Sequence, residues 1–502
     1  MLLQPIDRFC TANPSHNALT FNGQSYSYAA LWEAVERLRG SLASRGIGKG
    51  DSVAIMLPNC PHFVIAHLAV LGLGAVSVPI NIQHKAREIA WQIEDSEARA
   101  LIAWTNLAAE TEKAVFQSDS LRMRVYLGDA VPADALSLLD MIGQGERVSL
   151  NTDASENDLA AIIYTAGTGG HPRGVELTHA AFAAHARTLS QLLRLRDTDV
   201  FYGSIPFSGI AGLTLTVHLP LMAGAHMQIH SRFHPGDALR CLHDNHVSVL
   251  IANPVSYSLM TTFPSTEKYD LSQLRYAISC EAKLTDQIAR EADEKLKIRI
   301  FEGYGTTESC GLVTLNLFPG LTERGSVGQP IPGIELKIVN EAGKIPDIGE
   351  AGQVAVTGPT IMHGYRNRPD KTRQVLSDGW LNTCDRGFLD EQGNLYVTGH
   401  GAEIIMKGGF PVCSREIEEV VEGLPHVREV AVVGIPDSIL GEDIKVCVVL
   451  KEGASIGPGE IVEYVKERVA AYKLPKLVKL YKELPRTATG KIIRSQLKEE
   501  KP

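Results

Sequence analysis

Short apolar runs alternate with amphipathic stretches from the start of the chain to about Gly325. Each apolar run has the length of a buried strand and is too short to cross a bilayer as a helix. Apolar residues spaced three and four apart predict helices between the runs, the last with Thr178 as its N-cap. This alternation predicts parallel α/β sheets. The expected strands are 52–57, 99–104, 160–164 and 247–252, and the expected helices are 28–45, 63–73 and 180–193.

The pattern changes after Gly325. As far as Tyr396, short apolar segments are separated by Gly, Pro, Asn and Asp, which is typical of a β-barrel-like or antiparallel β subdomain. The C-terminal residues predict a separate α+β lid with helices 414–422 and 459–470 and strands 427–433 and 443–450. We therefore expect an α/β fold with a large N-terminal region (1–398), which includes the β subdomain, and a small mobile C-terminal domain (399–502).

Composition agrees with several soluble domains. The chain has 502 residues, of which 44% are hydrophobic and 21% charged, and single cores stop growing at roughly 250 to 300 residues. A net charge of -9 argues against nucleic acid as a partner. Eight cysteines without metal-ligand spacing, and a first segment without a signal-peptide pattern, indicate a reducing cytoplasm. Two long uncharged stretches, 52–84 and 200–231, are interrupted by Pro and His and predict buried core.

A Gly/Thr-rich turn lies between an expected strand and an expected helix. It reads Tyr164-Thr-Ala-Gly-Thr-Gly-Gly-His-Pro-Arg-Gly-Val-Glu-Leu-Thr-His179. Glycines let the backbone approach a polyphosphate, exposed amides and Thr hydroxyls donate to its oxygens, and Arg173 supplies a cation. The Gly-Lys-Ser/Thr of a Walker A loop does not follow. Taken alone, such a turn is more often an ordinary loop.

Four further segments follow in order. They are Glu302-Gly-Tyr-Gly-Thr-Thr-Glu308, Asp378-Gly-Trp-Leu-Asn-Thr-Cys-Asp385, the glycine-rich stretch 399–418, and Leu484-Pro-Arg-Thr-Ala-Thr-Gly-Lys-Ile-Ile-Arg494. Together with the Gly/Thr-rich turn they resemble the motifs of the adenylate-forming superfamily, which includes acyl-CoA synthetases, luciferases and nonribosomal adenylation domains. The resemblance spans nearly the whole chain.

The resemblance implies a nucleotide site in the large region. The turn would hold phosphates, Tyr304 and Gly305 the adenine, Thr307 the α-phosphate, and Asp385 the ribose hydroxyls. Glu308 would hold Mg²⁺, which prefers oxygen ligands. Without the resemblance, the segment around Glu308 reads equally well as a capped helix start. The implied turn residues are Thr165, Gly167, Thr168, Gly170 and Arg173.

The resemblance also implies roles in the small domain. His400 would lie near the ribose and phosphate, and Gly408 and Gly409 would face coenzyme A. Lys491 is the expected catalytic residue, with Arg173 and Glu308 assisting. A carboxylate that approaches an α-phosphate is repelled by it, and an ammonium group between the two anions stabilises the transition state.

Several positions depart from the family pattern. Ala166 and Gly169 replace hydroxyl residues, and Arg173 replaces lysine but keeps the charge. Cys384 stands where glycine is usual and is interpreted as a small packed residue. The hinge carries His400 and Ala402 in place of the usual charged residues. These departures leave open a nucleotide-binding relative that does not catalyse.

The acid is expected to be apolar. The chain has no acidic residue between Asp199 and Asp237, where amino-acid-activating relatives place an Asp, so amino acids are disfavoured. Apolar residues in 210–222 and 311–315, with Gly303, could house a fatty or aryl acid, although ordinary core looks the same. The spacing of His218, His226, His230 and His234 matches no usual zinc site.

These observations lead to one functional hypothesis with two alternatives. We expect a cytoplasmic ATP-dependent carboxylic acid:CoA ligase that uses ATP, Mg²⁺ and coenzyme A. A homodimer is a candidate assembly. The first alternative is an enzyme that loads a carrier protein or stops at acyl-AMP. The second is the non-catalytic relative.

Overall fold

Two large sheets form the N-terminal domain. The computed structural model describes residues 2–116, 118–150, 154–165, 172–317, 325–340, 342–399, 404–486 and 492–499. The first sheet runs, in spatial order, β19 (Gly364–Tyr365), β9 (Arg173–Thr178), β8 (Leu159–Thr165), β4 (Val76–Pro79), β3 (Ser52–Met56), β5 (Ala98–Trp104), β6 (Met123–Leu127) and β7 (Leu136–Ser137). The second runs β16 (Gln329–Pro330), β15 (Gly311–Leu315), β14 (Ile300–Thr306), β13 (Tyr276–Ser279), β12 (Val249–Ala252), β10 (Val200–Gly203), β11 (His226–Ile229), β1 (Asn17–Phe21) and β2 (Gln24–Ser27).

The centres of both sheets are parallel and the ends are not. β3 pairs in parallel with β4 and β5, and β12 pairs in parallel with β10 and β13. β8 and β9 form an antiparallel hairpin, as do β14 and β15. The expectation of parallel α/β sheets is confirmed, with antiparallel strands added at the sheet edges.

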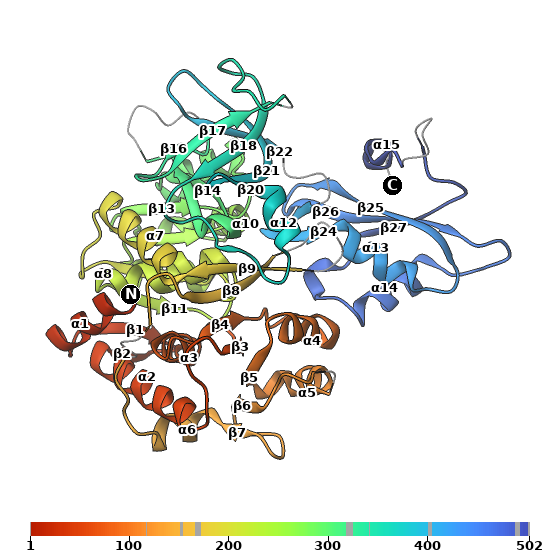
Figure 1. Cartoon of the computed structure of the whole chain (residues 1–502). Coiled ribbons are helices and arrows are strands. Elements are labelled where there is room, and N and C mark those ends of the chain that lie inside the picture. Colours follow the sequence, from red (N-terminus) through yellow and green to blue (C-terminus); the bar gives the residue numbers. More distant parts are fainter. Residues whose placement is uncertain are drawn as a thin grey trace.

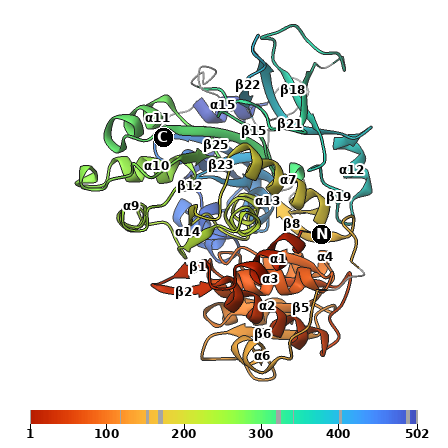
Figure 2. The same ribbon diagram turned by 90° about the vertical axis from the view of Figure 1, so that its left-hand side faces the viewer.

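Helices cover both faces of these sheets, as Figures 1 and 2 show. The large-domain helices are α1 (Gln4–Ala12), α2 (Tyr28–Ala43), α3 (Pro61–Gly72), α4 (Ala86–Asp95), α5 (Ala108–Val115), α6 (Leu138–Gln144), α7 (His179–Leu192), α8 (Leu219–Ala223), α9 (Pro235–Asp244), α10 (Pro254–Thr261), α11 (Asp286–Glu291) and α12 (Pro369–Val375). The hydroxyl of Thr178 accepts a hydrogen bond from Ala181 N, so the predicted N-cap of α7 is confirmed.

Alternating side chains of a buried strand enter different cores. On β3, Val53 and Ile55 join the largest core, which also contains residues of α2, α3, α7 and the second sheet. Ala54 and Met56 point the other way, into a core with α4 and α5. The continuous apolar runs of the sequence therefore reflect strands that are covered on both faces.

The segment after Gly325 folds mainly as an antiparallel sheet. Its strands are β17 (Glu335–Val339), β18 (Gly352–Thr357), β21 (Trp380–Leu389) and β20 (Leu376–Ser377), with β22 (Leu395–Gly399) paired to β21. The expected β subdomain is thus present.

The small domain has its own sheet and its own core. The sheet consists of β24 (Phe410–Cys413), β23 (Ile404–Lys407), β26 (Gly441–Leu450) and β25 (Val427–Asp437), with β27 (Leu477–Tyr481) on β26, and it is packed with α13 (Ser414–Glu422), α14 (Pro458–Lys466) and α15 (Arg494–Glu499). Figure 1 shows this domain projecting from one side of the large one. No helix in the described ranges is long and apolar enough to span a membrane.

One helix is shorter than predicted. The pattern predicts a helix over 459–470, but α14 ends at Lys466. Ala470 then adopts an extended conformation, and a short 3-10 turn, Ala471–Lys473, follows. This turn carries the side chain of Lys473 to the boundary with the large domain.

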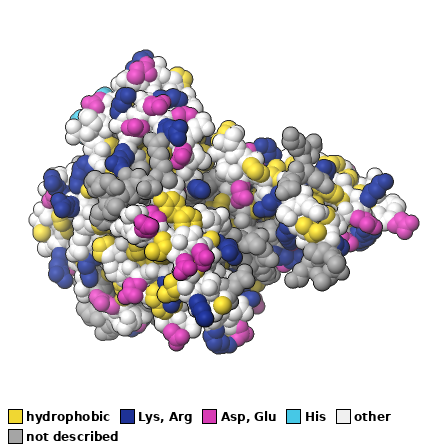
Figure 3. Space-filling model, turned by 90° about the horizontal axis from the view of Figure 1, so that it is seen from above, with side chains coloured by type: hydrophobic (Ala, Val, Ile, Leu, Met, Phe, Trp, Pro, Cys, Tyr) yellow, Lys and Arg dark blue, Asp and Glu magenta, His cyan; other side chains and the backbone are white. Residues whose placement is uncertain are grey.

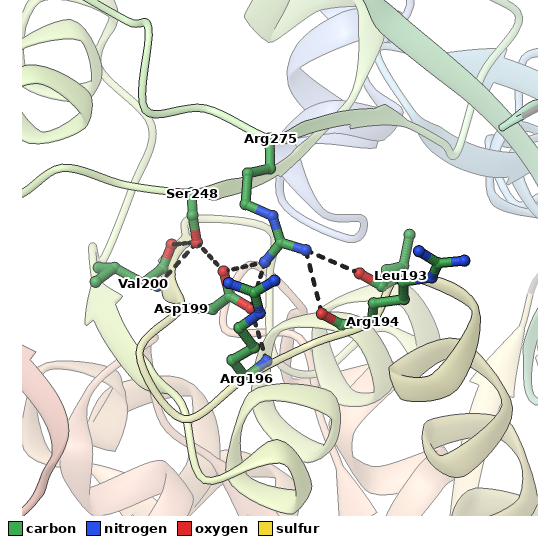
Figure 4. Close-up of polar contacts among 7 residues, drawn as sticks. All are labelled: Leu193, Arg194, Arg196, Asp199, Val200, Ser248 and Arg275. Atoms are coloured by element: carbon green, nitrogen blue, oxygen red, sulfur yellow. Dashed lines mark hydrogen bonds and ion pairs between the residues drawn. The ribbon is translucent and has the colours of Figure 1, made fainter. Parts of the chain in front are cut away.

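A partly buried ion pair fixes the starts of three parallel strands (Figure 4). Arg275, just before β13, donates to both carboxylate oxygens of Asp199, at 2.6 and 2.8 Å. Asp199 precedes β10, and its Oδ1 also accepts a hydrogen bond from Ser248 Oγ, just before β12, at 2.7 Å. The second guanidinium nitrogen donates to the carbonyls of Leu193 and Arg194, which close α7. The pair therefore sets the relative positions of these strands from their N-terminal edge.

We predict that Arg275→Met lowers the free energy of unfolding of the large domain by about 3 kcal/mol, because it leaves the carboxylate of Asp199 buried without its cation. Urea denaturation followed by tryptophan fluorescence measures this change. Arg290→Ala removes an exposed partner of Asp286 and should change the free energy by less than about 0.5 kcal/mol. Equal effects of the two substitutions would contradict the prediction.

Candidate functional site

The site begins where three parallel strands end. Ala252 of β12 pairs with Ser279 of β13, which in turn pairs with Glu302 of β14. The residues that follow these positions therefore emerge at one sheet edge. In α/β sheets ligands bind outside the carboxyl ends of the strands.

β14 leads into a tight turn that presents Glu308. The Thr306 hydroxyl accepts a hydrogen bond from Ser309 N, and Ser309 Oγ accepts one from Thr306 N. Thr307 and Glu308 lie within this capped turn. Gly305 has a structural reason to be glycine, because a Cβ there would lie 1.9 Å from the carbonyl oxygen of Gly311 on the returning strand. Thr306 and Ser309 cap this turn, rather than Thr307 or Glu308, and Glu308 lies within it.

Glu308 contacts Tyr365, an aromatic residue for which the sequence motifs predict no role. Tyr365, on β19, donates a hydrogen bond from its hydroxyl to Glu308 Oε1 at 2.8 Å. Arg173, on β9, lies over the Tyr365 ring, with 5.4 Å between its guanidinium carbon and the ring centroid. Burial raises the pKa of Glu308, while the Tyr365 hydrogen bond and the charge of Arg173 oppose the rise. The fold thus brings together Arg173 and Glu308, which are far apart in the chain.

Asp385 joins the same cluster. Tyr304 donates a hydrogen bond from its hydroxyl to Asp385 Oδ2 at 2.7 Å, and both side chains are nearly buried. The carboxylate of Asp385 is close enough to contribute to the raised pKa of Glu308. Tyr304, Glu308 and Asp385 therefore lie together, as the resemblance implies.

The interpretation of Cys384 as a packed residue is wrong. Its side chain is exposed, and its backbone has a φ of 64°, in the left-handed region that favours glycine. The left-handed turn directs Asp385 inward and leaves Cys384 outside. The left-handed backbone at position 384 therefore explains why glycine is usual there in the family pattern.

The Gly/Thr-rich turn is described only at its two ends. Thr165 closes β8 and pairs in register with Arg173, the first residue of β9. Gly167, Thr168 and Gly170 lie outside the described residues. Thr165 therefore lies beside Arg173, near Glu308.

The acidic residues suit a divalent cation that arrives with a phosphate. Among the described ranges, no group of three or more His, Cys, Asp or Glu side chains could hold a metal ion by itself. Glu308 offers hard oxygen donors, and phosphate oxygens would complete the shell. The donor set fits Mg²⁺ better than zinc, which prefers nitrogen and sulfur ligands.

The small domain contacts this strand edge through two glycines. Gly408 and Gly409 have φ values of 60° and 89°, and Asn253 Nδ2, just after β12, donates a hydrogen bond to Gly408 O at 3.4 Å. A Cβ on Gly409 would lie 3.0 Å from Asn253 Nδ2 and 3.5 Å from Glu281 Oε2. The close approach explains why a side chain is absent here. His400 lies outside the described residues.

A buried lysine joins the two domains. Lys473 Nζ donates to Glu88 Oε1 of α4 at 2.5 Å and to Glu416 Oε1 of α13 at 2.6 Å. Burial alone would lower the pKa of Lys473, but Tyr472, Glu416 and Glu88 raise it above its ordinary value. Sequence reasoning did not find this residue, because a lysine in a surface-like segment gives no signal of burial.

Lys491 lies outside the described residues, but its flanks belong to the small domain. Arg486 pairs with Glu429 at 2.7 Å, and Arg494 pairs with Glu418 at 2.7 Å. Figure 1 shows α15 on the outer part of the small domain, away from β9 and β14. The structure therefore does not place the flanks of Lys491 beside Arg173, Tyr304 or Asp385.

The surface has no single dominant charge on the face that Figure 3 shows. Lys and Arg side chains alternate with Asp and Glu over its described part, and an apolar area lies near the middle. Backbone phosphates of a nucleic acid would favour a continuous basic stripe instead.

Comparisons with known proteins agree with these features. The family model for AMP-binding enzymes matches residues 6–366, and the model for their C-terminal domain matches residues 416–491. A long-chain-fatty-acid–CoA ligase of Bacillus subtilis (strain 168) is 30% identical, with 97% of this chain and 92% of the relative covered.

Solved structures match over the whole length. A double mutant of o-succinylbenzoate CoA synthetase from Bacillus subtilis, bound to its product analogue OSB-NCoA, has a TM-score of 0.88 at 27% identity and covers 99% of this chain and 98% of its own. ATP-bound MatB from Rhodopseudomonas palustris has a TM-score of 0.74 at 28% identity, with 99% of each chain covered. The resemblance drawn from the five sequence segments is confirmed: the chain belongs to the family of AMP-binding, adenylate-forming enzymes.

Proposed function

We propose that the protein is an ATP-dependent carboxylic acid:CoA ligase. In the first step the acid and ATP give acyl-AMP and pyrophosphate, and in the second acyl-AMP and CoA give acyl-CoA and AMP. One observation carries the proposal. Three separate segments bring together Arg173, the pair Tyr304 and Glu308, and Asp385, and the glycine pair of the small domain meets the same strand edge.

The first step requires that two anions approach each other. We assign Arg173 to the phosphates because its guanidinium can bind their oxygens in a bidentate way. Asp385 would accept hydrogen bonds from ribose hydroxyls, with Tyr304 holding its second oxygen. Glu308 would hold Mg²⁺, which supplies a positive charge to the phosphates. Lys491 would enter the site when the small domain takes a second orientation.

The second step suits the orientation in the structure. Gly409 lies against Asn253 and Glu281 at the strand edge, and the buried charge of Lys473 ties the small domain to Glu88 of the large one.

The substrate we propose is a fatty or other apolar acid. The π-helical turn Gly212–His218 and strand β15 are buried and carry no Asp or Glu. A substrate ammonium group would lack a carboxylate partner in these segments, and burying an unpaired charge is costly. A Cβ on Gly303 would lie 3.0 Å from Leu312 of β15, so the backbone packs closely against this apolar strand.

Lys491→Ala should lower acid-dependent ATP–pyrophosphate exchange by about a hundredfold or more, because removing a charge aimed at the transition state costs that much. Exchange of labelled pyrophosphate into ATP with a panel of acids measures the first step alone. The matched control is Lys498→Ala, an exposed lysine on α15, which should keep full exchange. A wild-type protein without exchange for any acid would contradict the enzymatic proposal.

Glu88→Gln should slow thioester formation about tenfold and leave pyrophosphate exchange unchanged. Lys473 would keep Glu416 but lose its partner on the large domain, so the buried charge would be compensated less well in this orientation. Single-turnover transfer from preformed acyl-AMP to CoA measures the effect. Glu463→Gln, an exposed carboxylate on α14, is the control. Equal losses in both half-reactions would contradict a role in orientation.

A further inference from the structure

Glu281 is a carboxylate at the strand edge that the proposed chemistry leaves unused. It follows β13, whose last residue, Ser279, pairs with Glu302 of β14. Continuing this register by two residues places Glu281 beside Tyr304 on one side and Pro254 on the other, and Asn253 and Glu281 both approach Gly409. Glu281 therefore lies between the nucleotide cluster and the glycine pair of the small domain.

The backbone of Glu281 is strained. Its φ is 71°, in the left-handed region, which is unfavourable for an L residue other than Gly, Asn or Asp. Such conformations persist where the surroundings hold them, and they concentrate at functional sites. The conformation turns the side chain toward the small domain, where Oε2 lies 3.5 Å from the point that a Cβ on Gly409 would occupy.

Among the described residues, the carboxylate of Glu281 forms no ion pair with a cation. Within the described part of the chain it makes no hydrogen bond or ion pair, and burial raises the pKa of Glu281 to about 8. The neighbouring titratable groups do not neutralise it. Burial, followed by the charge of Glu281, raises the pKa of the Cys280 thiol. Glu302 accepts a hydrogen bond from Leu284 N, and its own pKa is raised by burial to about 7 although the charge of Lys283 opposes this.

We propose that Glu281 is the general base of the thioester-forming step, an inference that rests on the proposed CoA ligase activity. The thiol proton of CoA passes to the Glu281 carboxylate while the sulfur forms a bond to the carbonyl carbon of acyl-AMP. The bond from that carbon to the phosphate oxygen then breaks, and AMP leaves with the electron pair. Gly409 and Asn253 border the space in which the thiol meets the carboxylate.

The pKa values of a thiol and of the Glu281 carboxylate suit this proton transfer. The thiolate is the nucleophilic form, and a free cysteine thiol has a pKa near 8.5. A base is most effective when its pKa lies near the working pH, and such a base contributes roughly a hundredfold to ten-thousandfold. Only the ionised carboxylate accepts a proton, so the rate of thioester formation should rise with pH through about 8.

The test is Glu281→Gln, which keeps the size of the side chain but cannot accept the proton. Acid-dependent pyrophosphate exchange should stay within about threefold of the wild-type rate, whereas transfer from preformed acyl-AMP to CoA should fall about a hundredfold. The rise of the transfer rate through pH 8 should disappear in the variant. Asp286→Asn, an exposed carboxylate on the same connection, is the control and should match the wild type in both steps.

Three outcomes would overturn the proposal. If Glu281→Gln transfers the acyl group to CoA at the wild-type rate, the carboxylate takes no proton. If transfer is slower but its pH profile is unchanged, Glu281 only shapes the site. Loss of both half-reactions would place Glu281 in the nucleotide site. Failure of the wild-type protein to exchange pyrophosphate or to form a CoA thioester would instead reject the proposed function itself, and these wild-type measurements come first.

Discussion

The orientation of the small domain depends on one buried charge. Lys473 lies between a carboxylate of each domain, Glu88 and Glu416, with little access to water. A buried ammonium group is tolerated only when it is paired, so an orientation that separates Lys473 from Glu88 removes half of its compensation. Because α14 ends early and a 3-10 turn follows it, the side chain of Lys473 lies at the boundary between the domains. The contact holds the Gly408–Gly409 loop against Asn253 and Glu281.

The two edges of the second sheet have different roles: one holds a stabilising ion pair, and the other carries residues of the candidate site. At the N-terminal edge, the ion pair of Asp199 and Arg275 joins the starts of β10, β12 and β13 to the end of α7. At the opposite edge, the same strands deliver Asn253 and Glu281, and β14 delivers Tyr304. Because parallel strands share a direction, fixing their register at one edge fixes the neighbours at the other. Stability and chemistry thus use different ends of the same strands.

Much of the fold and half of the site could be predicted from local pattern. The helix capped by Thr178 and the apolar strands were found because periodicity and capping are local properties. Tyr304, Glu308 and Asp385 could be proposed as site residues because each belongs to a short segment of fixed spacing, and the fold brings them together. Tyr365 was assigned no role, because its hydrogen bond to Glu308 depends on pairing between β9 and β19. Cys384 was interpreted wrongly, because a left-handed backbone cannot be read from a cysteine.

The sequence by itself determined the class of fold, the family and the order of the motifs. These properties follow from periodicity, turn residues and spacing, which act over a few residues at a time. Only the tertiary structure decided which charges are buried and what they meet. Lys473 and Glu281 look like ordinary surface residues in the sequence, and their environments arise from segments hundreds of residues away. Burial and charge pairing are properties of the packed molecule, so the partners of Lys473 and the neighbours of Glu281 are set only when the two domains come together.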